Sequence, residues 1–567
     1  MSIRQFTSVF LMAGIALILA SCTSEEEKYR ELPVETYVSK MKAGWIGQMA
    51  GVGWGAPTEF QYNGRIIPAS EMPEWKPEMV NQYNQDDIYV EMTFLQSLET
   101  YGMDVTYKQA GIDFANSGYA LWHANRAGRN NLRSGIAPPD AGHPEFNKHA
   151  DDIDYQIEAD YAGLIAPGMP NVAISLGEKF GRLMNYGDGM YGGQFVAGMY
   201  AEAFFEKDME KVVRAGLECI PEGSQYAECI RDVLDWYDEY PDDWEKTWEE
   251  VEKKYNDNPD YRRFSCSGAE SDFNIDAKIN GAYIVMGLLY GEGDPDKTII
   301  ISTRCGQDSD CNPSNAAGIL FTSMGFENLP EKYTQALNEE NTFSHTPYTF
   351  PKLISVCKDL VRESLKRNGG EIQQNDGGDS IFIIPKQTPE PSKLVQSWDP
   401  EPPANSRYTE EEMAKIQGYP RNAHQDELAN IAEGWEIINM GKNEKLDPGF
   451  HSELVGKNDV FVSHPMNRGT ACEFQNGFDI PSGKSPLLYL NVGHQPEGAW
   501  KLEIRVNWEP VLTKTINKET TNENGWTEIV VDLEEYAGEH VRLSLSHQYH
   551  DSDQAAARWK EIRVEGL

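Results

Sequence analysis

Apolar residues recur at helical spacing from about residue 31 to residue 368. Two stripes show the period most clearly, and each places its apolar side chains on one helix face. The first stripe is Val212, Val213, Leu217 and Ile220, and the second is Tyr226, Ile230, Val233, Leu234 and Tyr237. Residues 195–205 and 279–290 are instead rich in Gly, Ala and large apolar residues, which predicts helices buried on most sides. The pattern predicts an all-α domain over residues 33–368.

Beyond residue 406 the apolar period falls from about 3.6 to 2, which is typical of strands with one buried face. The segments with this pattern are residues 486–495, 499–508, 526–533, 540–549 and 559–567. They predict an antiparallel β-sandwich over residues 407–567. This region resembles the galactose-binding-like jelly-roll modules of extracellular carbohydrate enzymes. Its tryptophans could stack on sugars or form the sandwich core: Trp500, Trp508, Trp526 and Trp559.

Residues 369–406 separate the two patterns and are rich in Gly, Gln, Asn and then Pro. Prolines favour an extended, semi-rigid chain, so this segment is predicted to be a linker. A chain of 567 residues also exceeds what one hydrophobic core usually organises. The sequence therefore predicts a multidomain protein in which an all-α bundle is followed by an all-β jelly-roll sandwich.

The N-terminus has the order of a bacterial signal peptide, with Arg4 before a short apolar run. Residues 19–22, "LASC", resemble a lipobox, the recognition sequence for lipoprotein processing. The resemblance implies a lipoprotein signal over residues 1–22, a lipid on Cys22, and an acidic tether over residues 23–32. We expect a lipid-anchored protein of the outer membrane or periplasm, with cell-surface export as a further option. An ordinary cleaved signal peptide is the alternative.

The chain is strongly acidic, with 50 Lys and Arg against 90 Asp and Glu and a formal net charge of −40. Such a charge repels a phosphate backbone, so nucleic acid is not an expected partner, and anionic membrane surfaces are disfavoured. The expected membrane contact is the lipid anchor alone. The cysteines after Cys22 show no zinc-binding spacing, and one disulfide, Cys219 with Cys229, is left open.

Two acidic motifs, far apart in the sequence, each precede a helix. Asp86 and Asp87 come directly before an apolar helix face, with Glu91 one turn farther on. Asp308 and Asp310 lie in "STRCGQDSDCNPSNAAGILF" before a second helix. One carboxylate would suffice to cap each helix, so the additional charge favours a hard, oxygen-binding cation. Capping and solvated turns are the alternatives.

A glycine-rich stretch, "GQMAGVGWGAPTEF", comes earlier and ends near Glu59. Its glycines would let two helices approach closely or let a ligand reach the backbone. It has no Walker lysine and follows no predicted strand, so a phosphate-binding loop is not expected.

The order of these motifs resembles the ADP-ribosylglycohydrolase family over about residues 35–345: the glycine-rich stretch, an Asp pair opening a helix, and a late Gly-x-Asp-x-Asp. The resemblance implies an all-α bundle that holds one or two divalent ions in a cleft, usually Mg²⁺ or Mn²⁺ and with Ca²⁺ as an option. It also implies hydrolysis at the anomeric carbon of a ribose. Carried over by motif, the metal ligands are Asp86, Asp87, Asp308 and Asp310, and the catalytic carboxylates are Glu59 and Asp87.

The chain departs from the family's pattern at four positions. Gln85 stands where a hydroxyl residue precedes the Asp pair, and Val52 replaces an aspartate. Ile88 and Cys311 stand where threonines usually follow the acidic motifs. A Gln oxygen can coordinate a hard ion, whereas a thiol suits it poorly. Gln85 is therefore added to the expected ligands, and one metal position is expected to be weakened or altered.

Electrostatics favours a cation independently of the family. If the five carboxylates converge, adjacent pairs at about 4 Å would repel by roughly 4 kcal/mol each at an effective dielectric constant of about 20. Two divalent ions would nearly cancel this charge, whereas shared protons would leave a metal-free acid/base pair.

A third acidic segment lies between the two motifs. It carries His143, His149, Asp151, Asp152, Asp154, Glu158 and Asp160. We expect it to line the substrate cleft, with an exposed loop as the alternative.

The sequence thus predicts a metal-dependent hydrolase that cleaves a glycosidic bond outside the cytoplasm. The expected substrate is a carbohydrate or another ribosyl-containing compound, and the expected ion is Mg²⁺. One alternative is a hydrolase of ADP-ribosyl conjugates. The other, favoured by Ile88 and Cys311, is a non-catalytic surface lipoprotein that binds glycans.

Overall fold

The structure, a computed structural model, describes residues 28–375, 377–416 and 424–566. The last range lacks residues 433, 439, 442–445, 455, 466–470, 482, 497, 507–508, 538–539 and 551–555. The contacts within the structure divide the chain into two compact units, Met1–Gln417 and Gly418–Leu567. The predicted signal segment, the lipidation site Cys22 and the first part of the acidic tether lie outside the described residues. Among the described residues, no helix is both long and apolar enough to cross a membrane.

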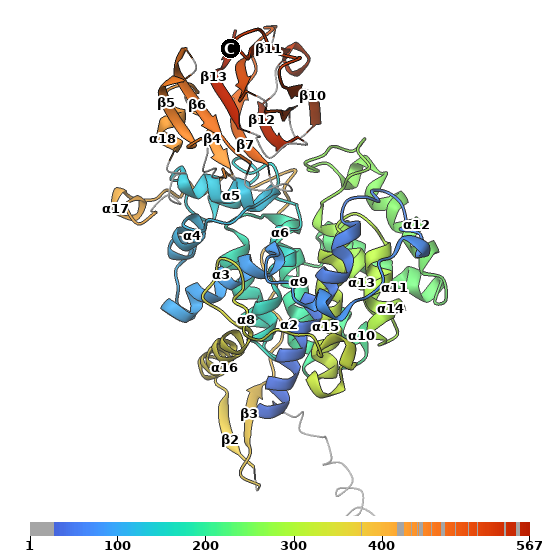
Figure 1. Ribbon diagram of the computed structural model, residues 1–567. Coiled ribbons are helices and arrows are strands. Elements are labelled where there is room, and N and C mark those ends of the chain that lie inside the picture. Colours follow the sequence, from blue (N-terminus) through green and yellow to red (C-terminus); the bar gives the residue numbers. More distant parts are fainter. Residues whose placement is uncertain are drawn as a thin grey trace, which may run out of the picture. The chain divides into compact units, whose positions relative to one another are not determined.

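The first unit is built almost entirely of helices (Figure 1), which confirms the predicted all-α bundle. Its main helices are α2 (Val34–Gly55), α3 (Asp86–Tyr101), α4 (Tyr107–Ala115), α5 (His123–Arg133), α6 (Asp154–Ile157), α7 (Asp160–Leu164), α8 (Pro170–Leu176), α9 (Gly187–Ala203), α10 (Met209–Glu218), α11 (Gln225–Glu239), α12 (Trp244–Val251), α13 (Ala277–Tyr290), α14 (Pro295–Arg304), α15 (Cys311–Met324), α16 (Phe350–Arg367) and α17 (Glu410–Met413). Short 3-10 and π-helical turns connect several of them.

Four helices, α2, α9, α13 and α15, form the interior of this unit. The whole of α13 and nearly all of α9 and α15 are buried, as their composition predicts. Helix α2 packs against α15 through glycines one turn apart. A Cβ atom at Gly47, Gly51 or Gly55 would lie 2.4, 2.2 or 2.0 Å from a backbone oxygen of α15 or the loop before it. The glycine stretch therefore serves close helix packing, one of its two predicted uses.

Residues 369–406, predicted to be a linker, belong to the first unit. They include β2 (Glu371–Gln374) and β3 (Ser380–Pro385), and β3 pairs with both β2 and β1 (Tyr29–Pro33) in one antiparallel sheet. The tether predicted up to residue 32 therefore ends in a strand. The proline-rich part then runs along the helices as a strap, residues 387–408. The prediction failed because an extended, proline-rich chain can also lie on a surface that satisfies its backbone groups.

Helical side chains and backbone groups hold the strap along its length. Asn171 donates to the carbonyl of Thr388 at 3.0 Å, and Tyr191 donates to that of Lys393 at 2.7 Å. Near its end, Asp140 accepts hydrogen bonds from the backbone N–H groups of residues 404 and 406, both at 2.8 Å. These contacts replace the water that a free linker would bind.

The second unit is an antiparallel β-sandwich, which confirms the predicted fold class. Its elements are α18 (Gln425–Leu428), β4 (Glu436–Ile438), β5 (Gly449–Leu454), β6 (Lys457–Ser463), β7 (Cys472–Asp479), β8 (Leu487–His494), β9 (Trp500–Val506), β10 (Glu509–Ile516), β11 (Trp526–Asp532), β12 (His540–Tyr549) and β13 (Ala557–Glu565). Within the described residues they form two sheets, in the orders β10-β9-β12-β7-β4 and β11-β8-β13-β6-β5.

The tryptophans of the sandwich lie in its core. Trp500 and Trp559 are fully buried, with ring centroids 5.2 Å apart across the two sheets, and Trp526 is 2% exposed. Trp508 is outside the described residues. The alternative that these three rings fill the core therefore holds.

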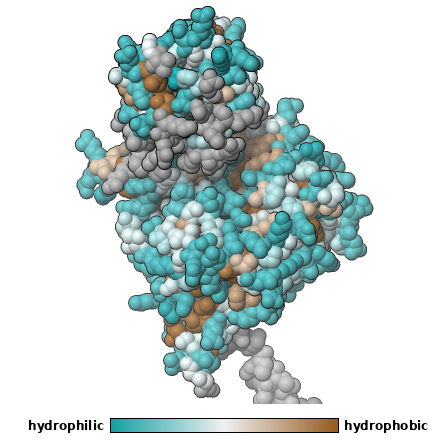
Figure 2. Space-filling view, viewed as in Figure 1, coloured by the Kyte–Doolittle hydropathy of each residue, from teal (hydrophilic) through white to brown (hydrophobic). Residues whose placement is uncertain are grey.

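Hydrophilic residues cover much of the face shown in Figure 2. The disulfide left open by the sequence does not form: Cys219 and Cys229 are both free and buried.

We predict that Gly51→Ala destabilises the helical unit by at least roughly 1–3 kcal/mol, because the new methyl group would force α2 away from Pro313 of α15. Urea unfolding of the full chain measures the change. Gly223→Ala is the matched control, since its Cβ would meet only the flexible end of Leu394, at 3.1 Å. Equal effects of the two substitutions would contradict the packing argument.

Candidate active site

Three segments far apart in the sequence supply the acidic residues. Asp86 and Asp87 form the first turn of α3. Asp310 is the N-cap residue of α15, and Asp308 lies two residues before it. Glu59 directly follows the 3-10 turn η1 (Ala56–Thr58) that continues α2. The packing of α2 on α15 thus brings Glu59 to the loop that carries the late aspartates.

Direct side-chain contacts join these segments. The thiol of Cys311 donates a hydrogen bond to Asp87 Oδ1 at 3.0 Å, and its Sγ lies 3.8 Å from Asp310 Oδ1. At the end of α2, the Thr58 hydroxyl is 2.9 Å from that of Ser309, which lies between the two late aspartates. The first turns of α3 and α15 therefore meet at one place.

The acidic cluster extends from the protein interior to solvent. Asp87 is fully buried, and Asp308 and Asp310 are each 3% exposed. Asp86 is partly exposed and Glu59 is exposed. A substrate could therefore reach the cluster from the Glu59 side.

Crowding raises the pKa of each of these carboxyl groups. Loss of water, together with the charges of Asp310 and Asp86, raises the pKa of Glu59 to about 8. Water reaches Glu59, but the protein around its carboxyl group still disfavours the anion. Burial and the charge of Asp310 raise the pKa of Asp86 to about 6. Burial, followed by neighbouring aspartates, places the pKa values of Asp87 and Asp308 well above their usual range.

The donor atoms of the cluster fit a hard divalent ion. Oδ2 of Asp87 is buried and makes no hydrogen bond within the described residues, so a carboxylate oxygen there lacks a partner. One ligand atom from each of Asp308, Asp310 and Cys311 lies within 4.8 Å of the other two. Carboxylate oxygens suit Mg²⁺ or Mn²⁺, whereas the soft thiol does not. The carboxylate side of the cluster therefore fits such an ion better than the Cys311 side.

Two further polar residues bear on the same cluster. Gln85 is the N-cap residue of α3, is partly exposed and makes no capping bond through its side chain, so its role as a ligand stays a prediction. Ser314, which the motif comparison missed, opposes the rise in the pKa of Asp87, and its buried hydroxyl makes no hydrogen bond within the described residues. Its position one helical turn after Asp310 was the signal available in the sequence.

Glu91 supports the helices and does not join the cluster directly. Its carboxylate accepts hydrogen bonds from Gln48 Nε2 and from the backbone N–H of Tyr161, the latter at 2.9 Å. This contact ties α3 to α2 and to the start of α7.

The third acidic segment is not an exposed loop. Its two histidines and five acidic residues are all at most 7% exposed. Asp154 caps α5 by accepting the N–H groups of Ala124 and Asn125 at 3.1 and 3.0 Å. Asp160 accepts from Asn315 Nδ2 at 2.7 Å. These two residues therefore position helices, and the expectation that the segment lines a substrate cleft stays a prediction. Glu158 lies near enough to Asp86 and Asp87 that their charges raise its pKa.

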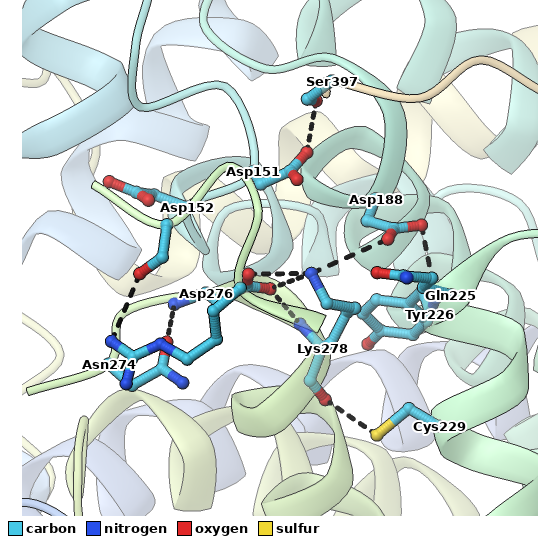
Figure 3. A network of polar contacts seen from close by, with 12 residues as sticks. Asp151, Asp152, Asp188, Gln225, Tyr226, Cys229, Asn274, Asp276, Lys278 and Ser397 are labelled. Carbon is cyan, nitrogen blue, oxygen red and sulfur yellow. Dashed lines mark hydrogen bonds and ion pairs between the residues drawn. The ribbon is translucent and has the colours of Figure 1, made fainter. Parts of the chain in front are cut away.

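A buried ion network holds several of these elements (Figure 3). Lys278, in the first turn of α13, lies 2.7 Å from Asp276 Oδ2 and 3.7 Å from Asp188 Oδ2. Asp188, at the start of α9, also accepts the N–H of Tyr226. Asp151 accepts a hydrogen bond from Ser397 of the strap. The buried cation of Lys278 thus joins α13 to α9, and its charge also acts on Asp151 beneath the strap.

A sequence model described as ADP-ribosylglycohydrolase matches residues 33–369. The chain belongs to the ADP-ribosylglycohydrolase family, as the motifs predict, and this membership supports hydrolase chemistry on glycosyl-type bonds. No curated protein matches the chain.

Three solved structures match parts of the chain. One titled "ADP-ribosylglycohydrolase-related protein complex" has 13% identity and a TM-score of 0.37, and the alignment covers 58% of this chain and 99% of the other. A family 35 carbohydrate binding module from an environmental isolate has 17% identity and a TM-score of 0.17, covering 23% and 86%. The K1 adhesin domain of Lys-gingipain from Porphyromonas gingivalis W83 has 15% identity and a TM-score of 0.19, covering 24% and 93%.

We predict that Lys278→Met destabilises the protein by roughly 3–5 kcal/mol, because it leaves buried carboxylates without their cation. The exposed pair Lys297–Glu292 provides the control, and Lys297→Met should leave the stability nearly unchanged. Urea unfolding measures both. A small effect at Lys278 would mean that the buried aspartates are neutralised by protons.

Stability without metal should fall as pH rises. The pKa values of Asp86 and Glu59 are raised in the folded state, so the folded protein binds these protons more tightly than the unfolded chain. These two groups contribute their full stabilisation below the pKa values of about 4 that they have in the unfolded chain. The contribution of Asp86 is lost as the pH rises through about 6, and that of Glu59 is lost as it rises through about 8. Denaturation in chelator between about pH 5 and about pH 9 measures the fall. Asp86→Asn with Glu59→Gln should flatten it, and equal slopes would contradict the prediction.

Proposed function

We propose that this protein is a divalent-cation-dependent hydrolase of a glycosidic bond, acting on a glycan or another glycoside. The observation that carries the proposal is the meeting of five carboxylates from three distant segments in a cluster that opens to solvent at Glu59. Family membership adds the reaction class. Clustered carboxylates with raised pKa values are typical of sites that bind a cation or transfer protons.

The buried aspartates hold the charge of the site in place. Asp86, Asp87, Asp308 and Asp310 would hold one or two Mg²⁺ ions, with Gln85 at the edge, and bound ions would polarise sugar hydroxyls and make a nearby water molecule easier to deprotonate. Asp87 is fixed by the thiol of Cys311, so its free oxygen keeps one direction.

Glu59 is the residue placed to move a proton. It is exposed at the mouth of the cluster, and its pKa of about 8 leaves it largely protonated at neutral pH when no cation is present. In that state it can protonate the departing sugar oxygen, and once it has lost the proton it can accept one from the attacking water. Added positive charge in the cluster would lower its pKa and favour the second role.

The proposed location rests on the N-terminal sequence. The lipobox-like residues 19–22 support a lipid anchor outside the cytoplasm, where glycans are more available than ADP-ribosylated proteins. Hydrolysis of ADP-ribosyl conjugates is the second candidate, and the family match favours it.

A hydrolysis screen of the full chain over glycans, nucleosides and ADP-ribosyl conjugates, with and without chelator, tests the proposal. We expect chelator-sensitive release of a sugar from a glycan or glycoside. Asp310→Asn and Glu59→Gln should each lower kcat by at least about 100-fold. Asp359→Asn, at an exposed carboxylate of α16, should leave it unchanged. Activity that resists chelator would refute metal dependence, and activity on ADP-ribosyl conjugates alone would favour the second candidate. Glycan binding without turnover would leave a binding protein.

A further inference from the structure

A second group of metal-binding side chains lies outside the acidic cluster: His149, Asp152 and Cys266. One ligand atom from each residue lies within 4.8 Å of the other two. His149 Nδ1 is 2.8 Å from Asp152 Oδ2, so these two side chains are already in contact. His149 and Asp152 are buried, and Cys266 is partly exposed. An imidazole, a carboxylate and a thiol from two separate segments thus converge on one small volume.

The segment that carries His149 and Asp152 is fixed without any metal. The side chain of Asn147 accepts the backbone N–H of His149 at 3.0 Å and donates to the carbonyl of Met184 at 2.7 Å. Asp152 forms a β-bridge with Asp276 at the start of α13. These contacts set the direction in which both side chains leave the backbone.

The loop that carries Cys266 is built around Arg262. This arginine donates to the carbonyls of Ser271 and Phe273 at 2.7 and 3.0 Å, and to the hydroxyl of Ser267 at 3.0 Å. The loop therefore holds its shape around a buried guanidinium group, and Cys266 lies inside it. Both halves of the group are preorganised, which lowers the cost of binding a ligand.

The arrangement differs from that of a nucleophilic cysteine. In a Cys–His–Asp triad the imidazole lies between the thiol and the carboxylate, so that it can take the thiol proton. Here the Nδ1 atom of His149 contacts the carboxylate of Asp152, and the thiol of Cys266 lies within 4.8 Å of a ligand atom of each. Three different donor atoms this close together suit shared ligation of one ion.

We propose that His149, Asp152 and Cys266 bind a Zn²⁺ ion. In a tetrahedral site, zinc bonds of roughly 2.0–2.3 Å place the donor atoms roughly 3.3–3.6 Å apart, so the three side chains need to move by only about 1 Å. Sulfur and imidazole nitrogen select zinc over Mg²⁺, in contrast to the all-carboxylate side of the acidic cluster. The fourth position is left to water or an incoming ligand.

The ion would fix the rim of the acidic cluster. It would tie residues 147–153 to the loop over residues 262–276. The ring of Phe273 in this loop packs against Phe60, with centroids 5.2 Å apart, and Phe60 is adjacent to Glu59. The zinc site is therefore a positioning element for the loop beside Glu59, and it is independent of the proposed hydrolase activity.

Cobalt spectroscopy tests the site, because Co²⁺ occupies tetrahedral zinc sites and absorbs by charge transfer when a thiolate is bound. The full chain, stripped of metal, is titrated with Co²⁺. We expect a thiolate charge-transfer band that saturates at a single equivalent and is lost when Zn²⁺ is added. Absence of the band in the wild-type protein would overturn the proposal.

Variants assign the thiolate. Cys266→Ser should abolish the band, whereas Cys311→Ser, which removes the thiol of the acidic cluster, should retain it. The opposite pattern would place the thiolate in the acidic cluster and overturn the proposal. If circular dichroism shows that Cys266→Ser does not fold, the His149→Gln variant tests the site instead. It keeps the thiol and should weaken Co²⁺ binding by roughly 10-fold or more. Unchanged affinity in that variant would equally overturn the assignment.

Discussion

Helices α2 and α15 lie so close together that a side chain larger than hydrogen at three positions of α2 would overlap the backbone at or just before α15. This contact determines where the ends of both helices lie. It brings Glu59, just past the end of α2, to the aspartates just before α15, and α3 adds its first turn to the same place. Protein interiors transmit small displacements because they are close-packed. The geometry of the acidic cluster therefore depends on glycines that make no contact with any ligand.

The fold also concentrates charges that would separate in solution. Burial and mutual repulsion raise the pKa values of the clustered carboxyl groups, so the folded chain carries an electrostatic cost that a cation or a proton must offset. Cys311 modifies this balance, because its thiol donates a hydrogen bond to Asp87. In the Lys278 network, by contrast, the protein supplies the cation itself. Buried acidic groups thus form two kinds of site here. Those without a lysine need an added cation or proton, and those around Lys278 are balanced by its charge.

Local sequence patterns, which involve residues close together in the chain, predicted most of the fold. Helical periodicity identified the first unit, and the alternation of β9 in burial matches its apolar pattern. The motifs identified which acidic residues meet, because the two Asp motifs lie at helix starts and Glu59 lies just past the end of a helix. Partners distant in sequence were not predictable: Glu91 binds Gln48 and Tyr161, and Asp154 caps α5. For the same reason, no spacing rule in the sequence connects His149 with Cys266. The composition of residues 369–406 also did not show whether this segment is a free linker or packs on the helices.

The small sheet β1-β3-β2 joins the beginning of the helical unit to its end. During synthesis, β1 emerges from the ribosome first but has no strand to pair with until β3 follows, after every main helix from α2 to α16 has been made. The helices can collapse earlier, the sheet that joins the two ends of the unit forms after them, and the strap follows the sheet. The region recognised by family resemblance ends at residue 369, before β3. A chain that ended at that point would leave β1 without the strand that pairs with it, and an unpaired strand is a site for association with other chains.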